Sequence, residues 1–168
     1  MTRTLLFSPW RLRDVEFRNR IMAAPMWQYA GQHWRPTDWH LMNLGRMADG
    51  GCGLVFQEGT TVERRGCGTV GDLGIWDDEA VPQMRRLVEM MESCGAVPGI
   101  QLMHPRRKAR QLPPDAGRGA LQRSDDIPDW DDWDVIAPSA IPLAGEGAAP
   151  PRAMDVADIH AVMDAFVA

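Results

Sequence analysis

Short apolar runs alternate with amphipathic segments over much of this chain. The apolar runs are 20–25, 53–58 and 97–104, and segments with helical spacing lie between them at 37–48 and 78–94. Neighbouring parallel strands need a long crossover, and a helix is the usual one. The order strand, helix, strand, helix, strand therefore predicts parallel βα units and an α/β fold.

Boundary signals support each predicted helix. Thr37 or Asp38 is a suitable N-cap for the first helix, and Gly95 follows the second helix where a left-handed residue often closes one. A third helix is predicted over 155–168, with Asp155 as its N-cap and apolar residues at Val156, Ile159, Val162, Met163 and Phe166. It reaches the last residue without a glycine or a basic final turn, so we expect the architecture to be incomplete there.

We interpret residues 1–168 as a single domain with four parts. Residues 1–19 predict a capping hairpin, 20–109 the βα units, 110–152 a loop excursion and 153–168 the last helix. Prolines recur through the excursion, and its apolar residues are scattered. A connection this long without regular structure is typical of a functional loop that crosses a binding face.

Composition excludes several classes of function. The 168 residues carry 18 basic and 23 acidic side chains, and this net charge of -5 gives no electrostatic reason to bind nucleic acid or an anionic membrane. No apolar run approaches the ~20 residues that cross a bilayer, and the N-terminus lacks the apolar core of a signal peptide. We therefore expect a cytoplasmic protein. Cys52, Cys67 and Cys94 form no CxxC pair, so neither a disulfide framework nor a zinc site is predicted.

Gln101 interrupts the third apolar run with an amide. A buried strand has no use for an amide unless the amide has a partner. The run opens into a basic loop with Arg106, Arg107 and Lys108, which suits either a small anion site or a solvated loop. Ligands of parallel α/β folds lie at the carboxyl ends of the strands. From the residues alone, Gln101 is either a ligand contact or, more commonly, a strand-end amide that bonds a neighbouring loop.

Other polar residues allow both structural and functional interpretations. Histidines 40 and 104 are more often structural hydrogen-bonding residues than catalysts, and neither has an acidic partner at motif spacing. Glu58 suits a buried structural carboxylate as well as a site residue. Asp72 and Trp76 are expected to make a turn hydrogen bond and a packing contact.

Seven short motifs occur in a recognisable order along the chain. They are Leu6–Pro9 (LFSP), Asn19–Ile21 (NRI), Ala24–Met26 (APM), Asp72–Trp76 (DLGIW), Ile100–His104 (IQLMH), Arg107–Ala109 (RKA) and Ala137–Ala140 (APSA). The ordered set resembles the Old Yellow Enzyme family of FMN-dependent ene-reductases, and most closely its bacterial branch of NADPH dehydrogenases and xenobiotic reductases. The resemblance extends from about Leu5 to the last residue. It implies a TIM (β/α)8-barrel type of fold, here truncated to about the first three βα units behind an N-terminal hairpin.

The resemblance also implies roles for individual residues. At the end of the first strand, the residues along the flavin ring would be Ala24, Pro25, Met26 and Trp27. Gly59 would lie at the end of the second strand, and Gln101 at the end of the third would bond the pyrimidine side of the isoalloxazine. Tyr29 matches the active-site tyrosine near the substrate. A flavin needs apolar walls and a few polar groups at its polar edge, and this set supplies both.

The chain departs from the family pattern in three respects. Trp27 stands where this branch usually has a cysteine, so the indole would crowd the ring or stack on it. Arg106 replaces a small residue in a tight turn. The third departure is length, because a TIM barrel needs ~250 residues. The family's paired histidines, flavin-side arginine and phosphate-binding loops have no counterpart in these positions, so we expect weak FMN binding by this chain alone.

The resemblance implies an FMN-dependent NAD(P)H oxidoreductase of the ene-reductase type. A hydride would pass from NAD(P)H to FMN and then to an activated alkene, a small-molecule partner. The alternative is a non-catalytic truncated half-barrel, without stable flavin binding, that pairs its open sheet edge with another chain. A homo-oligomer is left open, and no nucleic acid or membrane partner is expected.

Overall fold

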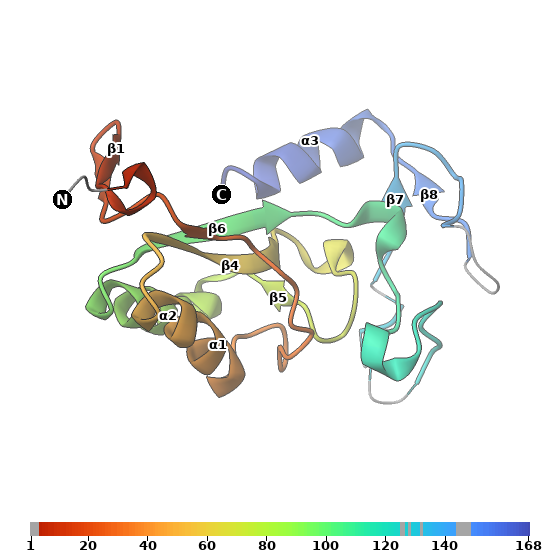
Figure 1. Ribbon diagram of the computed structural model, residues 1–168. Coiled ribbons are helices and arrows are strands. Elements are labelled where there is room, and N and C mark those ends of the chain that lie inside the picture. The colour runs from red at the N-terminus through yellow and green to blue at the C-terminus, as the bar shows by residue number, and fades with distance from the viewer. Residues whose placement is uncertain (1–3, 125–126, 128, 132, 144–148) are drawn as a thin grey trace.

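A computed structural model describes residues 4–124, 127, 129–131, 133–143 and 149–168 of the chain. Parallel strands and helices alternate through its first part, as the sequence predicts. Figure 1 shows α1 and α2 together below the strands and α3 above β6. Within the described residues, none of the helices is long and apolar enough to cross a bilayer.

An antiparallel hairpin precedes the sheet, at the position where the sequence predicts one. After the short 3-10 turn η1 (Leu5–Phe7), β1 (Trp10–Leu12) pairs with β2 (Val15–Phe17). The rings of Trp10 and Phe17 stack across the pair, with their centroids 5.3 Å apart. Most apolar side chains of this hairpin are exposed, and only Phe17 among its strand residues is buried.

The main sheet is parallel, with β4 (Leu54–Thr61) at its centre. β3 (Met22–Ala23) pairs with the start of β4, and β5 (Leu73–Gly74) pairs with its end. β6 (Val97–Met103) pairs with the opposite edge of β4 along its whole length, with a register shift between Gln57 and Gly59. Because all three strands run parallel to β4, their carboxyl ends point toward the same end of the sheet.

β5 is a strand that the sequence analysis did not predict. Leu73 and Gly74 lie in the motif that we assigned to a turn and packing, and two residues are too few for a periodic signal. The expected turn is present beside the strand, because the carboxylate of Asp72 accepts hydrogen bonds from the Gly68 N–H and the Thr69 hydroxyl. Burial raises the pKa of Asp72, although these two hydrogen bonds oppose the rise.

Two helices pack on one face of the sheet. α1 (Asp38–Asp49) has Thr37 as its N-cap, and the His40 side chain completes a capping box by accepting from the Thr37 N–H. α2 (Val81–Ser93) follows the 3-10 turn η3 (Asp78–Ala80). Gly95 closes α2 with a φ of +76°, as its position predicts.

The core lies between these helices and the sheet. Its buried members are Leu44, Ala48, Val55, Leu73, Ala80, Met84, Leu87, Met91 and Ala96. Burial of each leucine or methionine side chain contributes about 1.5–3 kcal/mol. α1 supplies Leu44 and Ala48, and α2 supplies Met84, Leu87 and Met91, whereas Val81 and Val88 of α2 stay exposed.

The excursion over 110–152 has more structure than the sequence suggested. It contains the 3-10 turn η5 (Pro114–Ala116) and β7 (Ile136–Ala137), which pairs in parallel with β8 (Arg152–Ala153). Trp133 is fully buried in a second apolar cluster that includes Ile127 and Cys67. No periodic signal indicated this cluster, because its tryptophans are separated along the chain.

Arginine stacking joins the excursion to the sheet. The guanidinium of Arg64, in the 3-10 turn η2 (Arg64–Gly66), lies 3.9 Å from the ring centres of both Trp34 and Trp133. It also pairs with the carboxylate of Asp129, with 2.9 Å between Arg64 Nη2 and Asp129 Oδ1. Such cation–π contacts contribute about 0.5–2 kcal/mol each.

α3 (Val156–Ala165) has the N-cap that the sequence predicts, since the Asp155 carboxylate accepts from the Asp158 N–H at 2.8 Å. Its predicted apolar face is largely uncovered in the structure. Of the five apolar positions only Val162 is buried. The start of the helix is held instead by ion pairs from Asp158 to Arg65 and Arg152.

Candidate functional site

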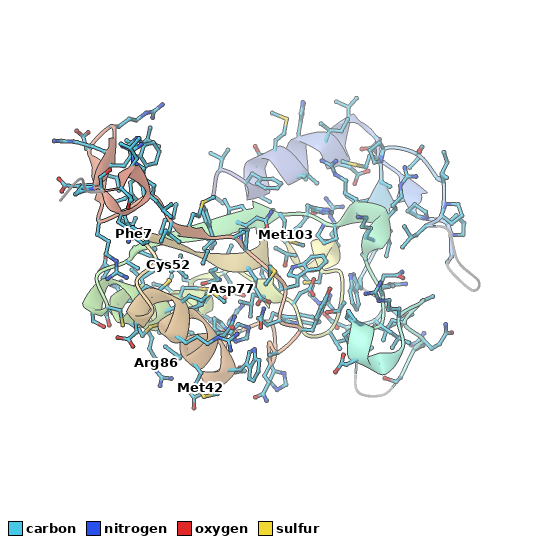
Figure 2. The ribbon with its side chains drawn as sticks, in the orientation of Figure 1. Phe7, Met42, Cys52, Asp77, Arg86 and Met103 are labelled. Carbon is cyan, nitrogen blue, oxygen red and sulfur yellow. The ribbon has the colours of Figure 1, made fainter. Side chains whose placement is uncertain are left out.

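The carboxyl ends of β3 and β6 enclose an open groove of about 500 Å³. Three residues that the sequence assigned to the flavin line it, from two separate segments of the chain: Pro25, Trp27 and Gln101. The rest of the lining follows β6 and comprises Met103, His104, Pro105, Arg106 and Lys108. Met103 is labelled in Figure 2 and marks the end of β6 at the groove.

Gln101 is exposed, so the expectation of a buried strand was wrong. β6 is hydrogen-bonded to β4 on one side, and no strand among the described residues covers its other edge. The Gln101 amide bonds no side chain or backbone group of the described residues. Its oxygen and its NH₂ group are both free to meet the polar edge of a ligand in the groove.

Trp27 lies over the end of β4. Its indole N–H donates to the Gly59 carbonyl at 3.1 Å, and its ring lies 5.7 Å from the ring of Tyr29 at a tilt of 57°. Gly59 has no space for a side chain. A β-carbon there would overlap the sulfur of Met103 and come within 2.7 Å of Trp27 Nε1. Gly59 thus sets how closely Trp27 and Met103 approach the strand end.

Ala24 and Met26 lie apart from the groove. Successive residues of an extended chain point to opposite sides, and these two alternate with Pro25 and Trp27. They line a separate small cavity beside Glu58 and His40. The structure therefore brings Pro25, Trp27, Gly59 and Gln101 together, and it leaves the predicted flavin contacts of Ala24 and Met26 as predictions.

Tyr29 lines a second hollow of about 290 Å³ that adjoins the groove. Trp27 and Lys108 border both spaces, and the excursion supplies Leu112, Pro114, Arg118, Gly119 and Leu143 to the second. Burial, and next the negative charge of Asp72, raises the pKa of the Tyr29 phenol. The phenol therefore stays protonated at neutral pH and is available as a hydrogen-bond donor.

His104 and Glu63 form a pair beside the groove that sequence analysis missed. His104 Nε2 lies 2.6 Å from Glu63 Oε1, and Arg65 Nε donates to the same oxygen at 2.7 Å. Burial opposes ionisation of Glu63, but the hydrogen bonds from His104 and Arg65 outweigh it and hold its pKa below the ordinary value. The partners are 41 residues apart, so no motif spacing indicated them.

Arg106 has a left-handed backbone, with a φ of +57°. A residue with a side chain rarely takes this conformation, which favours glycine. The backbone N–H of Arg106 donates to His104 Nδ1 at 3.2 Å, which helps to hold the turn. The structure thus places a bulky cation in a tight turn, which is the departure from the family pattern noted in the sequence. The Arg106 side chain is exposed on the rim of the groove.

The groove fits the ring portion of a flavin. Pro25, Trp27 and Met103 offer apolar surface, and the free Gln101 amide offers both a donor and an acceptor. Lys108 and Arg106 add positive charge at the rim. Within the described residues there is no cluster of three or more His, Cys, Asp or Glu side chains that would hold a metal ion. The apolar walls and the free amide of this lining suit an organic ligand with a polar edge.

Comparison with known proteins decides the family. The chain matches the model of the NADH:flavin oxidoreductase / NADH oxidase family over residues 5–168. The chain belongs to this family. The resemblance to Old Yellow Enzymes that the sequence motifs indicated is therefore confirmed.

Two curated relatives illustrate the match to the NADH:flavin oxidoreductase family. An NADH:flavin oxidoreductase of Gibberella zeae is 34% identical over 165 residues, which are 98% of this chain and 40% of the relative. An NADPH dehydrogenase of a Geobacillus species is 35% identical over 165 residues, 97% of this chain and 42% of the relative. The chain thus spans about two fifths of the length of these family members.

Solved structures show the same fold. The Old Yellow Enzyme from a Pichia species superposes with a TM-score of 0.80 at 21% identity, covering 98% of this chain and 41% of that one. Morphinone reductase in complex with tetrahydroNAD gives a TM-score of 0.77 at 23% identity, covering 98% and 44%. These enzymes are TIM barrels, and the chain has their fold over its matched length.

Proposed function

We propose that this chain carries flavin-ring contacts of an FMN-dependent NAD(P)H oxidoreductase of the ene-reductase type. The observation that supports the proposal is the groove in which Gln101, with its unbonded amide, faces Pro25 and Trp27. These residues belong to strand ends that converge only after folding. In the family pattern they are the residues that line the flavin.

Each residue has a distinct part in this proposal. Pro25 and Met103 form an apolar wall, and Trp27 closes the groove on the side of Tyr29. Gln101 hydrogen-bonds the polar edge of the ring, while Gly59 keeps the strand end free of a side chain. The chemistry that bound FMN supplies is hydride transfer from NAD(P)H to an activated alkene such as an enone. The Tyr29 phenol, in the adjoining hollow, would donate a hydrogen bond to the substrate.

We also propose that these contacts belong to a single domain that makes up about the first three βα units of a TIM barrel. The chain's coverage of about two fifths of its relatives supports this assignment. On this view, the remaining βα units would cover the open edge of β6, where Ile100 and Leu102 are 38% and 42% exposed. Cytoplasmic location remains part of the proposal.

The same exposed residues favour a second candidate, the non-catalytic half-barrel. An uncovered strand edge with apolar side chains readily pairs with another chain. In this case Ile100, Leu102 and the outer face of α3 would be buried between copies of the chain rather than by further βα units. The protein would then be a homo-oligomer without stable flavin binding.

The Gln101→Ala variant tests the leading proposal. Loss of one hydrogen bond to the ring should weaken FMN binding by roughly 3–10-fold, since such a bond contributes about 0.5–1.5 kcal/mol. Quenching of flavin fluorescence on titration with the 168-residue chain measures the dissociation constant. Gln122→Ala removes an exposed amide outside the groove and should leave it unchanged.

Two results would decide against the leading proposal. The first is equal FMN affinity in the Gln101→Ala and unchanged chains. The second is a colourless, oligomeric protein whose spectrum does not change with added FMN, which would favour the half-barrel. Flavin absorbance that survives gel filtration would exclude the half-barrel.

A further inference from the structure

A buried carboxylate and a buried imidazole lie beneath the loop that carries Trp27 and Tyr29. Glu58 is 3% exposed and His40 is 2% exposed, and 3.7 Å separates His40 Nε2 from Glu58 Oε2. His40 Nε2 and Glu58 Oε1 have no hydrogen-bond partner among the described residues. Each of these two neighbouring buried side chains thus leaves one polar atom unpaired, which is costly in a buried site and needs a common explanation.

The hydrogen bonds of His40 determine where its proton lies. The backbone N–H of Thr37 points at His40 Nδ1, with 2.9 Å between the nitrogens. A backbone N–H is always a donor, so Nδ1 is the acceptor and a neutral His40 carries its proton on Nε2. The Nε2–H group is therefore a donor directed at Glu58.

Glu58 receives a second donor from the functional loop. Its Oε2 accepts from the backbone N–H of Gln28 at 2.9 Å, and Gln28 lies between Trp27 and Tyr29. Two donors from separate parts of the chain, Gln28 N–H and His40 Nε2–H, thus face one carboxylate. A carboxylate serves both because all its lone pairs accept, and a buried charge needs such partners.

A small cavity lies between the two side chains. Its volume is about 10 Å³, and Glu58 and His40 line it together with Asn43 and Gln57. This volume suits one water molecule, which would accept from His40 Nε2–H and donate to Glu58 Oε1. The separation of 3.7 Å is too long for a direct hydrogen bond, and a bridging water would complete the contact.

We propose that Glu58 and His40, bridged by one water molecule, are positioning residues that set the loop 26–30 and hence Trp27 and Tyr29. The inference rests on the proposed function only for the roles of the two residues, Trp27 beside the flavin and Tyr29 beside the substrate. The start of α1 holds the same loop by two further hydrogen bonds. Thr37 Oγ1 donates to the Ala30 carbonyl at 3.1 Å, and Trp39 Nε1 donates to Gln28 Oε1 at 3.1 Å.

The backbone of Tyr29 explains why the loop needs this support. Its φ is +54°, a left-handed conformation that is strained for a residue with a side chain. The surroundings must therefore hold it. The bond from Gln28 N–H to Glu58 Oε2 restrains the peptide next to this residue, so loss of the pair should release Tyr29 from its position.

Tyr29 provides a spectroscopic test, because it is the only tyrosine in the chain. Labelling with 3-fluorotyrosine gives a single fluorine NMR resonance that reports on this position. In the Glu58→Gln variant, one carboxylate oxygen becomes an NH₂ group, so the side chain can no longer accept both donors. We expect the resonance to shift by more than its linewidth or to broaden as the loop samples other conformations.

The His40→Asn variant separates positioning from helix capping. The asparagine Oδ1 takes the place of His40 Nδ1 and accepts from the Thr37 N–H, so the cap of α1 is kept. The side chain is too short to place a donor where Nε2–H stands, so the donor toward Glu58 is lost. The proposal expects a shift as in Glu58→Gln, and it expects the double variant to move the resonance no further than the larger single change. If His40 acts only as a cap, His40→Asn leaves the resonance in place and the proposal is overturned.

Glu79→Gln is the matched control, because Glu79 is an exposed carboxylate in η3. It should leave the resonance unchanged. Far-UV circular dichroism establishes that each variant is folded, and if Glu58→Gln fails to fold, His40→Asn decides the question. The readout involves no flavin. A failure of this inference is therefore distinct from a failure of the proposed function, which the FMN titration measures.

Discussion

Gly59 shows how much one residue controls at the strand ends. It lies under the Trp27 indole and against Met103, and its carbonyl accepts the indole N–H. The same small residue allows β6 to pair with β4 beside it, since Gln101 is its partner in the ladder. The position of Trp27, and through it the shape of the groove, depends on the absence of a side chain here.

A Gly59→Ala variant should be less stable by about 1–3 kcal/mol, the usual cost of overpacking. The added methyl group must displace both the Met103 sulfur and the Trp27 ring. Urea denaturation followed by circular dichroism measures the free energy of unfolding. In a Met103→Ala background the same change should cost less, because the nearest atom is gone. If Gly59→Ala lowers the free energy of unfolding equally in both backgrounds, Met103 does not limit the space at position 59.

At the scale of elements, Arg18 holds the ends of two helices together. It follows β2, and its guanidinium donates to the Cys94 carbonyl at 2.8 Å beyond α2 and to the Cys52 carbonyl at 2.8 Å beyond α1. It also bonds the Ala48 carbonyl in the last turn of α1. These carbonyls lie in the last turn of α1 or just beyond the C-terminal ends of α1 and α2, where a cation interacts favourably with the helix dipole.

We expect Arg18→Ala to lower the free energy of unfolding by about 2–3 kcal/mol, since charged hydrogen bonds to buried carbonyls are lost. Arg18→Lys should recover only part of this, because an ammonium group cannot match the planar fork that reaches several carbonyls. Arg20→Ala, at an exposed position two residues away, is the control. Thermal or urea unfolding of the four proteins tests the ranking. Full recovery by lysine would contradict the role of the fork.

For the whole molecule, ion pairs attach α3 to the rest of the fold and, together with the apolar cluster around Trp133, attach the excursion. Arg65 pairs with both Glu63 and Asp158, Arg152 pairs with Asp158, and Arg64 pairs with Asp129. Hydrogen bonds from arginines, and for Glu63 also from His104, hold the pKa values of these three carboxyls below the ordinary range. For Glu63 they do so against the effect of burial.

Acid should therefore detach this part of the structure first. A carboxyl whose pKa is lower in the folded state stabilises it above the unfolded pKa, about 4, and this contribution is lost as the pH falls through the lower folded value. The contribution of Asp72 to stability changes with pH in the opposite direction, because burial raises its pKa and protonation therefore favours the folded state. We expect tryptophan fluorescence to change below about pH 4 before far-UV circular dichroism does, since Trp133 stacks on Arg64.

Asp129→Asn should make that fluorescence transition shallower, because one of the titrating carboxyls is gone. Asp131→Asn, at an exposed carboxylate nearby, provides the matched control. Coincident fluorescence and circular dichroism transitions would mean that the excursion and the sheet unfold together. The proposed order of events would then be wrong.

Much of the fold could be predicted from the sequence because its signals are local. The three runs that became β3, β4 and β6, and the caps at Thr37, Asp155 and Gly95, all depend on neighbours within a turn or two. The short strand β5 and the tryptophan cluster around Trp133 could not be predicted this way, since neither repeats along the chain. Family motifs named the groove residues, whereas spacing alone left Gln101 open between two interpretations.

The sequence by itself determined the order of βα units, the helix boundaries and the family to which the chain belongs. Only the tertiary structure decided that Gln101 is exposed, that Ala24 and Met26 point away from the groove, and that Glu58 faces His40. The physical reason is the range of the forces involved. Helix caps and strand periodicity act between neighbours, but the partner of a buried carboxylate is whichever donor the packed sheet and helices place beside it.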